Sequence, residues 1–468
     1  MSREARFVKN TMIVGIGKIT TQIVNFCLLP LYTNSINPEQ YGNVDLFQTY
    51  AGIIMVIVYL QIEQALFRFL VDARMQKEQE SSIMSTAIIF SLAVDIFLTV
   101  IGTIVKNIPG ISAYAYIFYM VAALHFFENM LQLARGGGDN VTYTIANFCN
   151  SVLLIFLNIV FLLVLHMKSE GMMLSIILSS VCSALYIVFK NKVYRRIHLK
   201  RFSFQKLKEL AAYSFPLVPN AISWWIIGAS DRIILSYFLG SAAIGLVTVS
   251  QKFSTAIFNV YCIVNITWNE FVSVNISDPE STKFSEMKEI ILSSFSAVCI
   301  GCISIVPLLF YFLINHQYND AYFYIPLYII GVMLNIVVNM MNAFFVGLKK
   351  TSDIAKTSAV AGIINIAINL LLVKYIGIYA AALSTILAYA ITAVWRIAGL
   401  KKYITIKWNY VKIINIIIQF VITLLLYYLK AAHVFYMINM LIAAAVWLLM
   451  NKRYIVNILN IIRRQIKK

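Results

Sequence analysis

Stretches of about 20 mostly apolar residues recur along the whole chain, and they constrain its fold more than any other feature. A helix of that length spans the hydrocarbon core of a bilayer, which is roughly 30 Å thick. Of the 468 residues, 60% are hydrophobic and only 12% are charged, a composition too apolar for the surface of a soluble protein. The runs are continuous rather than alternating, which argues against a membrane β-barrel. The pattern therefore predicts an all-α polytopic membrane protein.

About fourteen transmembrane helices are expected, joined by short connections. The one longer connection, "NKVYRRIHLKRFSFQKLKELAA" at 191–212, is basic and partly amphipathic. The predicted spans are 11–33, 44–70, 81–105, 113–134, 141–165, 172–190, 213–239, 242–271, 289–314, 321–346, 353–373, 378–398, 413–429 and 434–450.

The net charge of +18 is explained by the distribution of Lys and Arg rather than by nucleic acid binding. With the N-terminus inside, the inner segments hold 29 of these residues and the outer loops hold four. Such a bias orients membrane proteins, since cytoplasmic loops carry the excess of positive charge. We expect a multi-pass membrane protein with both termini in the cytoplasm and no nucleic acid partner.

Motifs of enzyme chemistry and of metal binding are missing from the sequence. The six cysteines fall in apolar spans, and "CIGC" at 299–302 has no second pair of ligands, so it predicts no metal site. "GSAAIGL" lacks the lysine of an ATP-binding loop, and "RGGGD" at 135–139 follows no predicted strand. No long outer loop could house a glycosyl-transfer or polymerase site. We expect no catalytic residue, no metal and no cofactor.

The two halves of the chain resemble each other. "INPEQYGNVDLFQ" after the first span aligns with "LGSAAIGLVTVSQ" after the seventh, which places Gly42 against Gly245. Transporters are commonly built from such repeats, with substrate sites between them. The predicted domains are an N-lobe of six spans at 1–195, a basic linker at 196–212, a C-lobe of six spans at 213–398, two further spans at 399–450 and a basic tail at 451–468.

Ionisable residues inside spans are candidates for function, because each costs about 2.5–3.5 kcal/mol to insert and should face a wet interior. Lys18 shares one helical face with Thr21, Gln22 and Asn25. Such a polar stripe predicts a cavity lining, with polar contacts between helices as the alternative. Asp95, Lys252 and Glu270 could instead lie near an interface and extend to it.

The second span contains "YLQIEQALFRF", with Glu63 and Arg68. A guanidinium matches phosphate geometry, so Arg68 could meet an anionic group; an interhelical salt bridge or a lipid anchor is the alternative. In the fourth span, "ALHFFEN" places His125 and Glu128 three residues apart on one face. They could bind a coupling proton or form a structural pair.

The seventh span, "SFPLVPNAISWWIIGASDRIILSYFLG", holds Asp231 and Arg232 side by side. Neighbours on a helix point about 100° apart, so the two cannot pair face to face. At least one must reach another helix or a cavity. Pro216 and Pro219 at the start of the span can bend it and free backbone carbonyls.

Several segments together resemble a known family. "YSFPLVPNAISWWIIGASDRIILSYFLGSAAIGL" is similar to the seventh-span signature of Wzx-type polysaccharide flippases, members of the MATE-like MOP exporter superfamily. "LPLYTNSINPEQYGNVDLFQTY", "EQALFRF", "GGGDNVTY" and "VGLKKTSDIAKTSAV" resemble the family's other recurrent segments in the expected order. The likeness extends over the whole chain.

The resemblance implies a V-shaped, inward- or outward-facing transporter of two six-helix lobes plus two C-terminal helices. It implies transport of undecaprenyl-diphosphate-linked oligosaccharide across the bacterial cytoplasmic (inner) membrane for O-antigen, capsule or exopolysaccharide biosynthesis. Transport would proceed by alternating access, driven by a gradient of H⁺ or Na⁺ or by consumption of the sugar units outside. Membrane lipids and polysaccharide polymerase or chain-length proteins are the further partners expected. The alternatives are a cation-coupled multidrug antiporter and a scaffold subunit without transport.

The residues offer specific groups for that task. A diphosphate needs positive partners, and the expected cationic cavity residues are Lys18, Arg68 and Arg232. A sugar needs a polar and aromatic passage, and the lining candidates are Gln22, Asn25, Asn220, Trp224, Trp225 and Asn265. The candidates for ion coupling are Asp231, Glu128, His125 and Glu63.

Overall fold

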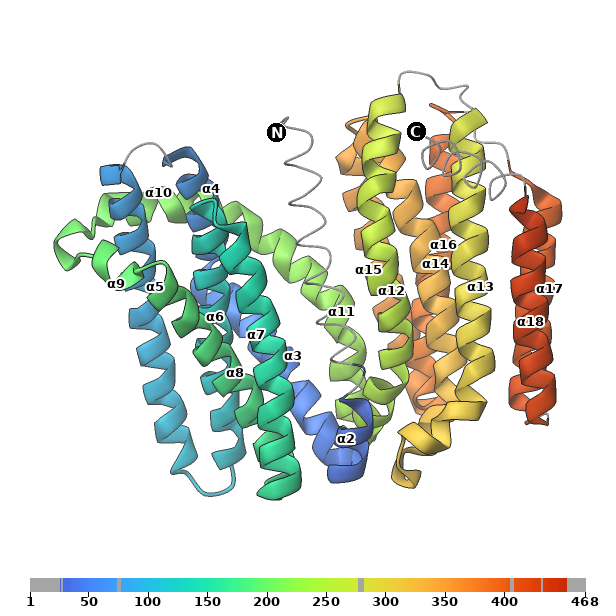
Figure 1. Ribbon diagram of the computed structural model, residues 1–468, viewed down its shortest axis with the longest axis horizontal. Coiled ribbons are helices and arrows are strands. Elements are labelled where there is room, and N and C mark those ends of the chain that lie inside the picture. The colour runs from blue at the N-terminus through green and yellow to red at the C-terminus, as the bar shows by residue number, and fades with distance from the viewer. Residues whose placement is uncertain are drawn as a thin grey trace, which may run out of the picture. The chain divides into compact units, whose positions relative to one another are not determined.

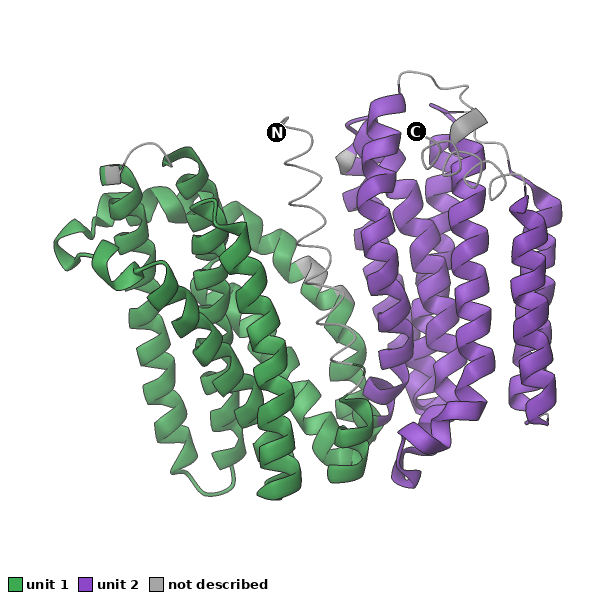
Figure 2. Cartoon of the chain, viewed as in Figure 1, with its two compact units in different colours: residues 1–245 green, residues 246–468 purple. Residues whose placement is uncertain are grey.

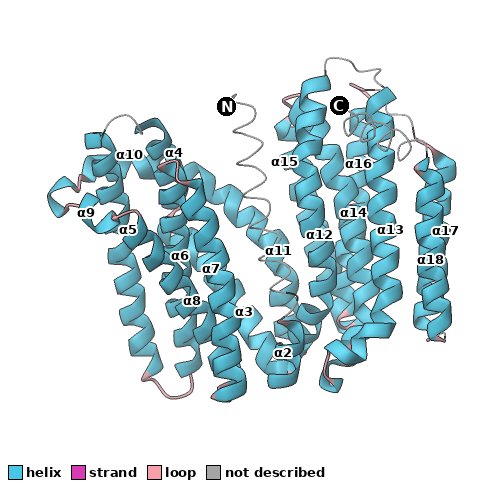
Figure 3. Cartoon of the chain, viewed as in Figure 1, coloured by secondary structure: helices cyan, strands magenta, loops and turns pink. Residues whose placement is uncertain are grey.

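The computed structural model describes residue 26 and residues 28–73, 77–276, 282–404, 408–430 and 432–452. Every described secondary-structure element is a helix (Figure 3). Among these residues, eleven helices are long and apolar enough to cross a membrane. The helices α11 (Val218–Leu239) and α12 (Ser241–Asn275) have sufficient length as well. The all-α polytopic fold predicted from the apolar runs is confirmed.

Contacts divide the chain into two compact units, residues 1–245 and 246–468 (Figure 2). The predicted lobes, 1–195 and 213–398, stay a prediction. Unit 1 contains α11 and the first turn of α12, as far as Gly245. The other helices of unit 1, seen in Figure 1, are α2 (Leu29–Ser35), α3 (Pro38–Tyr59), α4 (Ile62–Ala73), α5 (Lys77–Lys106), α6 (Ala115–Gly136), α7 (Asn140–Asn158), α8 (Lys168–Lys190), α9 (Val193–Arg196) and α10 (Phe204–Ser214).

In unit 1, α6 is the central helix. It packs against α3, α4, α5 and α8, and sixteen of its residues are buried. Its C-terminal half joins an apolar core that includes Leu66 of α4, Ala87 of α5 and Ala184 of α8. A side chain on α6 is therefore shielded from lipid and solvent on most sides, which makes any polar group there a candidate for function.

Unit 2 is built around α14 (Ala321–Gly347), with α15 (Thr351–Ile376) and α16 (Tyr379–Leu400) packed together beside it. The last two helices, α17 (Tyr410–Tyr428) and α18 (His433–Met450), pack on α13 (Thr282–Leu313). Tyr427 ties α17 to the rest of the unit, because its buried hydroxyl donates to the carbonyl of Tyr322 at 2.7 Å.

The predicted spans agree closely with the described helices after the first span. The exception is the second, 44–70, which the structure divides into α3 and α4. Leu60 and Gln61 between them have φ of 54° and 59°, a conformation uncommon for residues other than glycine.

Candidate functional site

The break between α3 and α4 positions two polar side chains inside unit 1. Tyr59 is the last residue of α3 and is buried, and Glu63 lies in the first turn of α4 and is only 4% exposed. A carboxylate in the first turn of a helix is stabilised by the exposed backbone N–H groups there. Non-helical backbone at membrane depth is tolerated where it is covered by protein, and such strained positions are concentrated at functional sites.

His125 of α6 lies between two carboxyl groups that come from different helices. Its Nε2 is 4.0 Å from Oε2 of Glu63 on α4, and its Nδ1 is 3.5 Å from Oδ1 of Asp95 on α5. The imidazole is completely buried, and Asp95 is 8% exposed. Three helices therefore bring together two acids and one base in a water-poor interior.

Tyr59 completes the cluster and orients its members. Its hydroxyl donates a hydrogen bond to Oδ1 of Asp95, and its ring stacks on the imidazole of His125 with an interplanar angle of 10°. The phenol thus fixes the position of Asp95 while its ring covers one face of His125. We refer to Tyr59, Glu63, Asp95 and His125 as the acid–imidazole cluster.

Hydrogen bonds within this cluster are incomplete. Three buried atoms have no hydrogen-bond partner among the described residues. They are Nδ1 and Nε2 of His125 and Oδ2 of Asp95. Buried polar atoms are normally paired, so unpaired ones indicate strain, chemistry or a bound group. With two carboxyl groups and one imidazole, the cluster can gain or lose a proton while its heavy atoms stay in place.

A cavity of about 430 Å³ reaches the cluster from one side. Asp95 is among its lining residues, and most of the others are apolar residues of α5, α6 and α8. The acid–imidazole cluster is thus closed toward the centre of unit 1 and approachable at Asp95.

Glu128 does not belong to the cluster. One turn beyond His125 on α6, its Oε1 accepts a hydrogen bond of 2.7 Å from Nε2 of Gln132. The structure therefore brings together two of the predicted coupling residues, Glu63 and His125, and it adds Asp95 on the other side of the imidazole. Asp231, the fourth coupling candidate, is a buried residue of α11.

The predicted cationic residues have acidic partners where the structure describes them. Arg232 of α11 donates from Nε to Oδ2 of Asp45 on α3 and from its terminal nitrogen to the carbonyl of Gly228, at 3.0 Å. Arg68 pairs with Asp72 one turn further along α4, and its side chain is 48% exposed. Lys18 lies outside the described residues. Phosphate binding by these three residues stays a prediction.

The predicted lining residues are dispersed. Trp225 of α11 donates from its indole to the carbonyl of Thr49 at 3.0 Å, so it contacts α3 as Arg232 does. Asn220 is exposed near the start of α11, and Asn265 of α12 accepts from the hydroxyl of Tyr261 within unit 2. Gln22, Asn25 and the side chain of Trp224 lie outside the described residues.

A buried arginine in unit 2 is a residue whose role the sequence did not reveal. Arg396 of α16 is 1% exposed and donates to hydroxyl, amide and carbonyl oxygens of α14 and α15. Its acceptors are Thr357, Val338, Asn342, Ile354 and Ser358. The guanidinium thus joins three helices at one point.

We expect Arg396→Leu to destabilise unit 2 by about 3 kcal/mol, since each buried acceptor left without a donor costs about 1–3 kcal/mol. The thermal midpoint in detergent should fall by roughly 6–12 °C. Arg396→Lys should recover only part of the loss, because an ammonium lacks the planar fork. Lys402→Leu, at an exposed position just after α16, is the control. Equal midpoints for wild type and Arg396→Leu would contradict this role.

Two solved structures of membrane proteins have a similar fold. The lipid II flippase MurJ, in an inward closed conformation, matches with a TM-score of 0.69 at 11% identity over 97% of this chain and all of that chain. An inward-facing multidrug resistance MATE family transporter of the MOP superfamily matches with a TM-score of 0.61 at 16% identity, over 83% of this chain and 99% of that one. The fold is that of a MATE-like integral membrane transporter.

The sequence comparisons are more specific. The chain belongs to the family of polysaccharide biosynthesis proteins, whose profile matches residues 7–267. A protein of the Lsg locus of Haemophilus influenzae is 20% identical over 265 residues, which make up 53% of this chain and 61% of that relative. The resemblance to MOP-superfamily polysaccharide flippases is thereby confirmed.

Proposed function

We propose that this protein moves undecaprenyl-diphosphate-linked oligosaccharide across the bacterial cytoplasmic membrane for O-antigen, capsule or exopolysaccharide biosynthesis. The observation that carries the proposal is the family match over residues 7–267, which include the acid–imidazole cluster and all of α11. The fold shared with a lipid II flippase supports it, because that protein is named for a lipid-linked substrate. Both termini would face the cytoplasm, as the excess of inner Lys and Arg predicts.

Lys18 and Arg232 would bind the diphosphate. Arg232 is held by Asp45 and Gly228, and its side chain retains 21% exposure. A diphosphate offers oxygens that a guanidinium fork can bind at two points. Substrate binding would therefore replace Asp45 as the partner of Arg232, while α11 keeps its contact with α3 through Trp225.

The acid–imidazole cluster would couple transport to an ion gradient, and its chemistry favours H⁺. An imidazole between two carboxyl groups changes its charge by binding one proton. A proton gained or lost in a buried site shifts the balance between two conformations if they hold it with different affinity. No group of three or more His, Cys, Asp and Glu residues suited to a metal ion occurs in the described part of the chain.

Complementation of a flippase-deficient strain tests the proposal, with surface glycan as the measurement. Wild type should restore export, whereas Lys18→Ala and Arg232→Ala should each reduce it by on the order of tenfold, the loss of one or two charge-assisted bonds to phosphate. Lys349→Ala, at an exposed position after α14, should export normally. Full export by both cavity variants would refute the cationic site, and failure of wild type with every donor glycan tested would refute the flippase assignment.

A second candidate function is cation-coupled multidrug export, which the likeness to MATE transporters favours. A drug exporter binds organic cations, so its cavity should favour acidic groups. Cells expressing this chain would then resist cationic dyes and lose that resistance in Asp95→Asn. Unchanged dye sensitivity together with restored surface glycan would exclude the multidrug function.

A further inference from the structure

The basic linker that follows α8 is attached along its length to the first turns of α5. The hydroxyl of Ser81 donates to the carbonyl of Arg196 at 2.8 Å. The backbone N–H groups of His198 and Ser203 donate to the hydroxyls of Ser85 and Thr86, at 3.0 Å and 3.2 Å. Ser85 and Thr86 are completely buried beneath the linker. The segment is therefore a fixed part of unit 1, and its side chains have defined positions.

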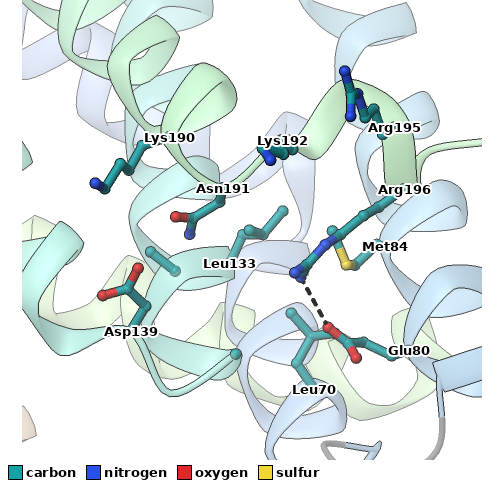
Figure 4. A pocket seen from close by; sticks show the side chains of 12 residues that line it. Leu70, Glu80, Met84, Leu133, Asp139, Lys190, Asn191, Lys192, Arg195 and Arg196 are labelled. Atoms are coloured by element: carbon teal, nitrogen blue, oxygen red, sulfur yellow. Dashed lines mark hydrogen bonds and ion pairs between the residues drawn. The ribbon is translucent and has the colours of Figure 1, made fainter.

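A pocket of about 400 Å³ lies beside this attached segment, where α4, α5, α6, α8 and α9 approach one another (Figure 4). Four of its lining residues are basic and two are acidic, which leaves a formal excess of two positive charges. The basic residues are Lys190, Lys192, Arg195 and Arg196, and the acidic ones are Glu80 and Asp139.

Both acidic groups are already engaged. Glu80 lies 3.3 Å from the guanidinium of Arg196, the contact drawn in Figure 4. Asp139 caps α7 and accepts from both the backbone N–H and the hydroxyl of Thr142, at 2.9 Å and 2.5 Å. Among the described residues, no carboxylate lies within ion-pairing distance of Lys190, Lys192 or Arg195. The pocket therefore offers uncompensated positive charge to an anion.

The surroundings of the pocket indicate which anion. Tyr194, Leu199 and Phe204 of the same segment are 53%, 80% and 76% exposed, and they alternate with Lys and Arg. Basic segments with exposed apolar and aromatic side chains lie at the level of lipid headgroups. The excess of Lys and Arg predicts this end of unit 1 at the cytoplasmic leaflet, where anionic lipids attract basic clusters.

We propose that the pocket bounded by Lys190, Lys192, Arg195 and Arg196 binds the phosphate group of an anionic phospholipid of the cytoplasmic leaflet. The phosphate would be attracted by the bases of this set that have no acidic partner, with Lys192 between the other two (Figure 4), and the acyl chains would lie along Leu199 and Phe204. This site is separate from Arg232 and from the acid–imidazole cluster, and it does not depend on the proposed function. The same phosphate chemistry could be presented by a soluble phosphate, so the test includes both sources.

The matched variants each remove one Lys and one Arg from the linker. Lys192→Gln/Arg195→Gln changes the pocket, and Lys200→Gln/Arg201→Gln changes exposed residues outside its lining. Purified full-length protein in mixed micelles is titrated with phosphatidylglycerol or phosphatidylcholine, and bound lipid is counted by native mass spectrometry. A second arm adds sodium pyrophosphate in the absence of phospholipid. Thermal midpoints establish that both variants are folded.

Wild type and the Lys200→Gln/Arg201→Gln control should bind phosphatidylglycerol in preference to phosphatidylcholine. The pocket variant should bind phosphatidylglycerol at least roughly tenfold less tightly than wild type does. If the pocket variant loses pyrophosphate but keeps the lipid, the phosphate site is supported and its ligand is soluble. Equal binding of both probes by the pocket variant and the control would overturn the proposal.

Discussion

Replacing Asp95 by asparagine is expected to reduce glycan export by at least about tenfold, since coupling between sites is typically worth 5–150-fold. Asparagine has nearly the same shape and can still accept the hydrogen bond from Tyr59, so the fold should persist. It cannot bind or release a proton beside His125. If the acid–imidazole cluster couples export to a proton gradient, this variant should export at a rate that no longer responds to an imposed gradient.

Two comparisons separate a coupling role from a structural one. Glu78→Gln removes a carboxylate from an exposed position on the same helix, α5, and should export normally. His125→Gln should lose the gradient response as Asp95→Asn does. The double variant should lose little more export than either single variant, because the effects of residues that act together are not additive. A gradient response in Asp95→Asn equal to that of wild type would remove the cluster from the mechanism.

The sequence predicted the spans well because each depends on local hydrophobicity alone. It also marked Glu63 and His125, since an ionisable group in an apolar run is costly and is retained for a purpose. Asp95 meets the same criterion, but the sequence is equally compatible with an interfacial location for it. Only packing decides this, by placing α5 against α6 so that Asp95 comes 3.5 Å from His125.

The helix break that positions Tyr59 and Glu63 had no signal in the sequence. Helices usually end at glycine or proline, but "VYLQIE" contains neither. Leu60 and Gln61 adopt left-handed conformations that these residue types disfavour. Burial of Tyr59 and Ile62 on either side must offset that cost. Such an effect arises from tertiary contacts and leaves no trace in local composition.

The partners of the buried charged residues could not be predicted from the sequence either. Asp45 and Arg232 are separated by 187 positions, and no periodicity relates them. Arg396 lies near the end of its span, where a positive-inside residue is expected, and yet the structure buries it completely among neutral acceptors. A sequence shows that a charge is present; the packing of the helices determines which oxygen atoms surround it.

The second large effect is expected at two glycines that the internal repeat had aligned. Gly42 of α3 and Gly245 of α12 lie where the first turns of these helices cross, within unit 1. A Cβ atom at Gly42 would lie 1.8 Å from the carbonyl oxygen of Ser241, and one at Gly245 would lie 2.0 Å from that of Pro38. Both neighbours are backbone atoms and cannot rotate away.

Gly42→Ala and Gly245→Ala should therefore each cost about 3 kcal/mol or more, the upper end of overpacking, and lower the thermal midpoint by at least roughly 6 °C. Size-exclusion chromatography of detergent extracts, with thermal melts of the folded fraction, measures both effects. Gly301→Ala is the control, because a Cβ there would meet no atom within 4 Å outside its own helix.

The two glycine variants should also lose similar amounts of stability, because the contact between the two helices is symmetric. The repeat pairs Pro38 with Ser241 and Gly42 with Gly245, and each glycine approaches the carbonyl of the residue that begins the other helix. Self-complementary contacts of this kind are what a two-fold relation produces. Similar losses for the two alanine variants would support a two-fold origin for this crossing, whereas a wild-type midpoint for either one would show that the helices can separate without cost.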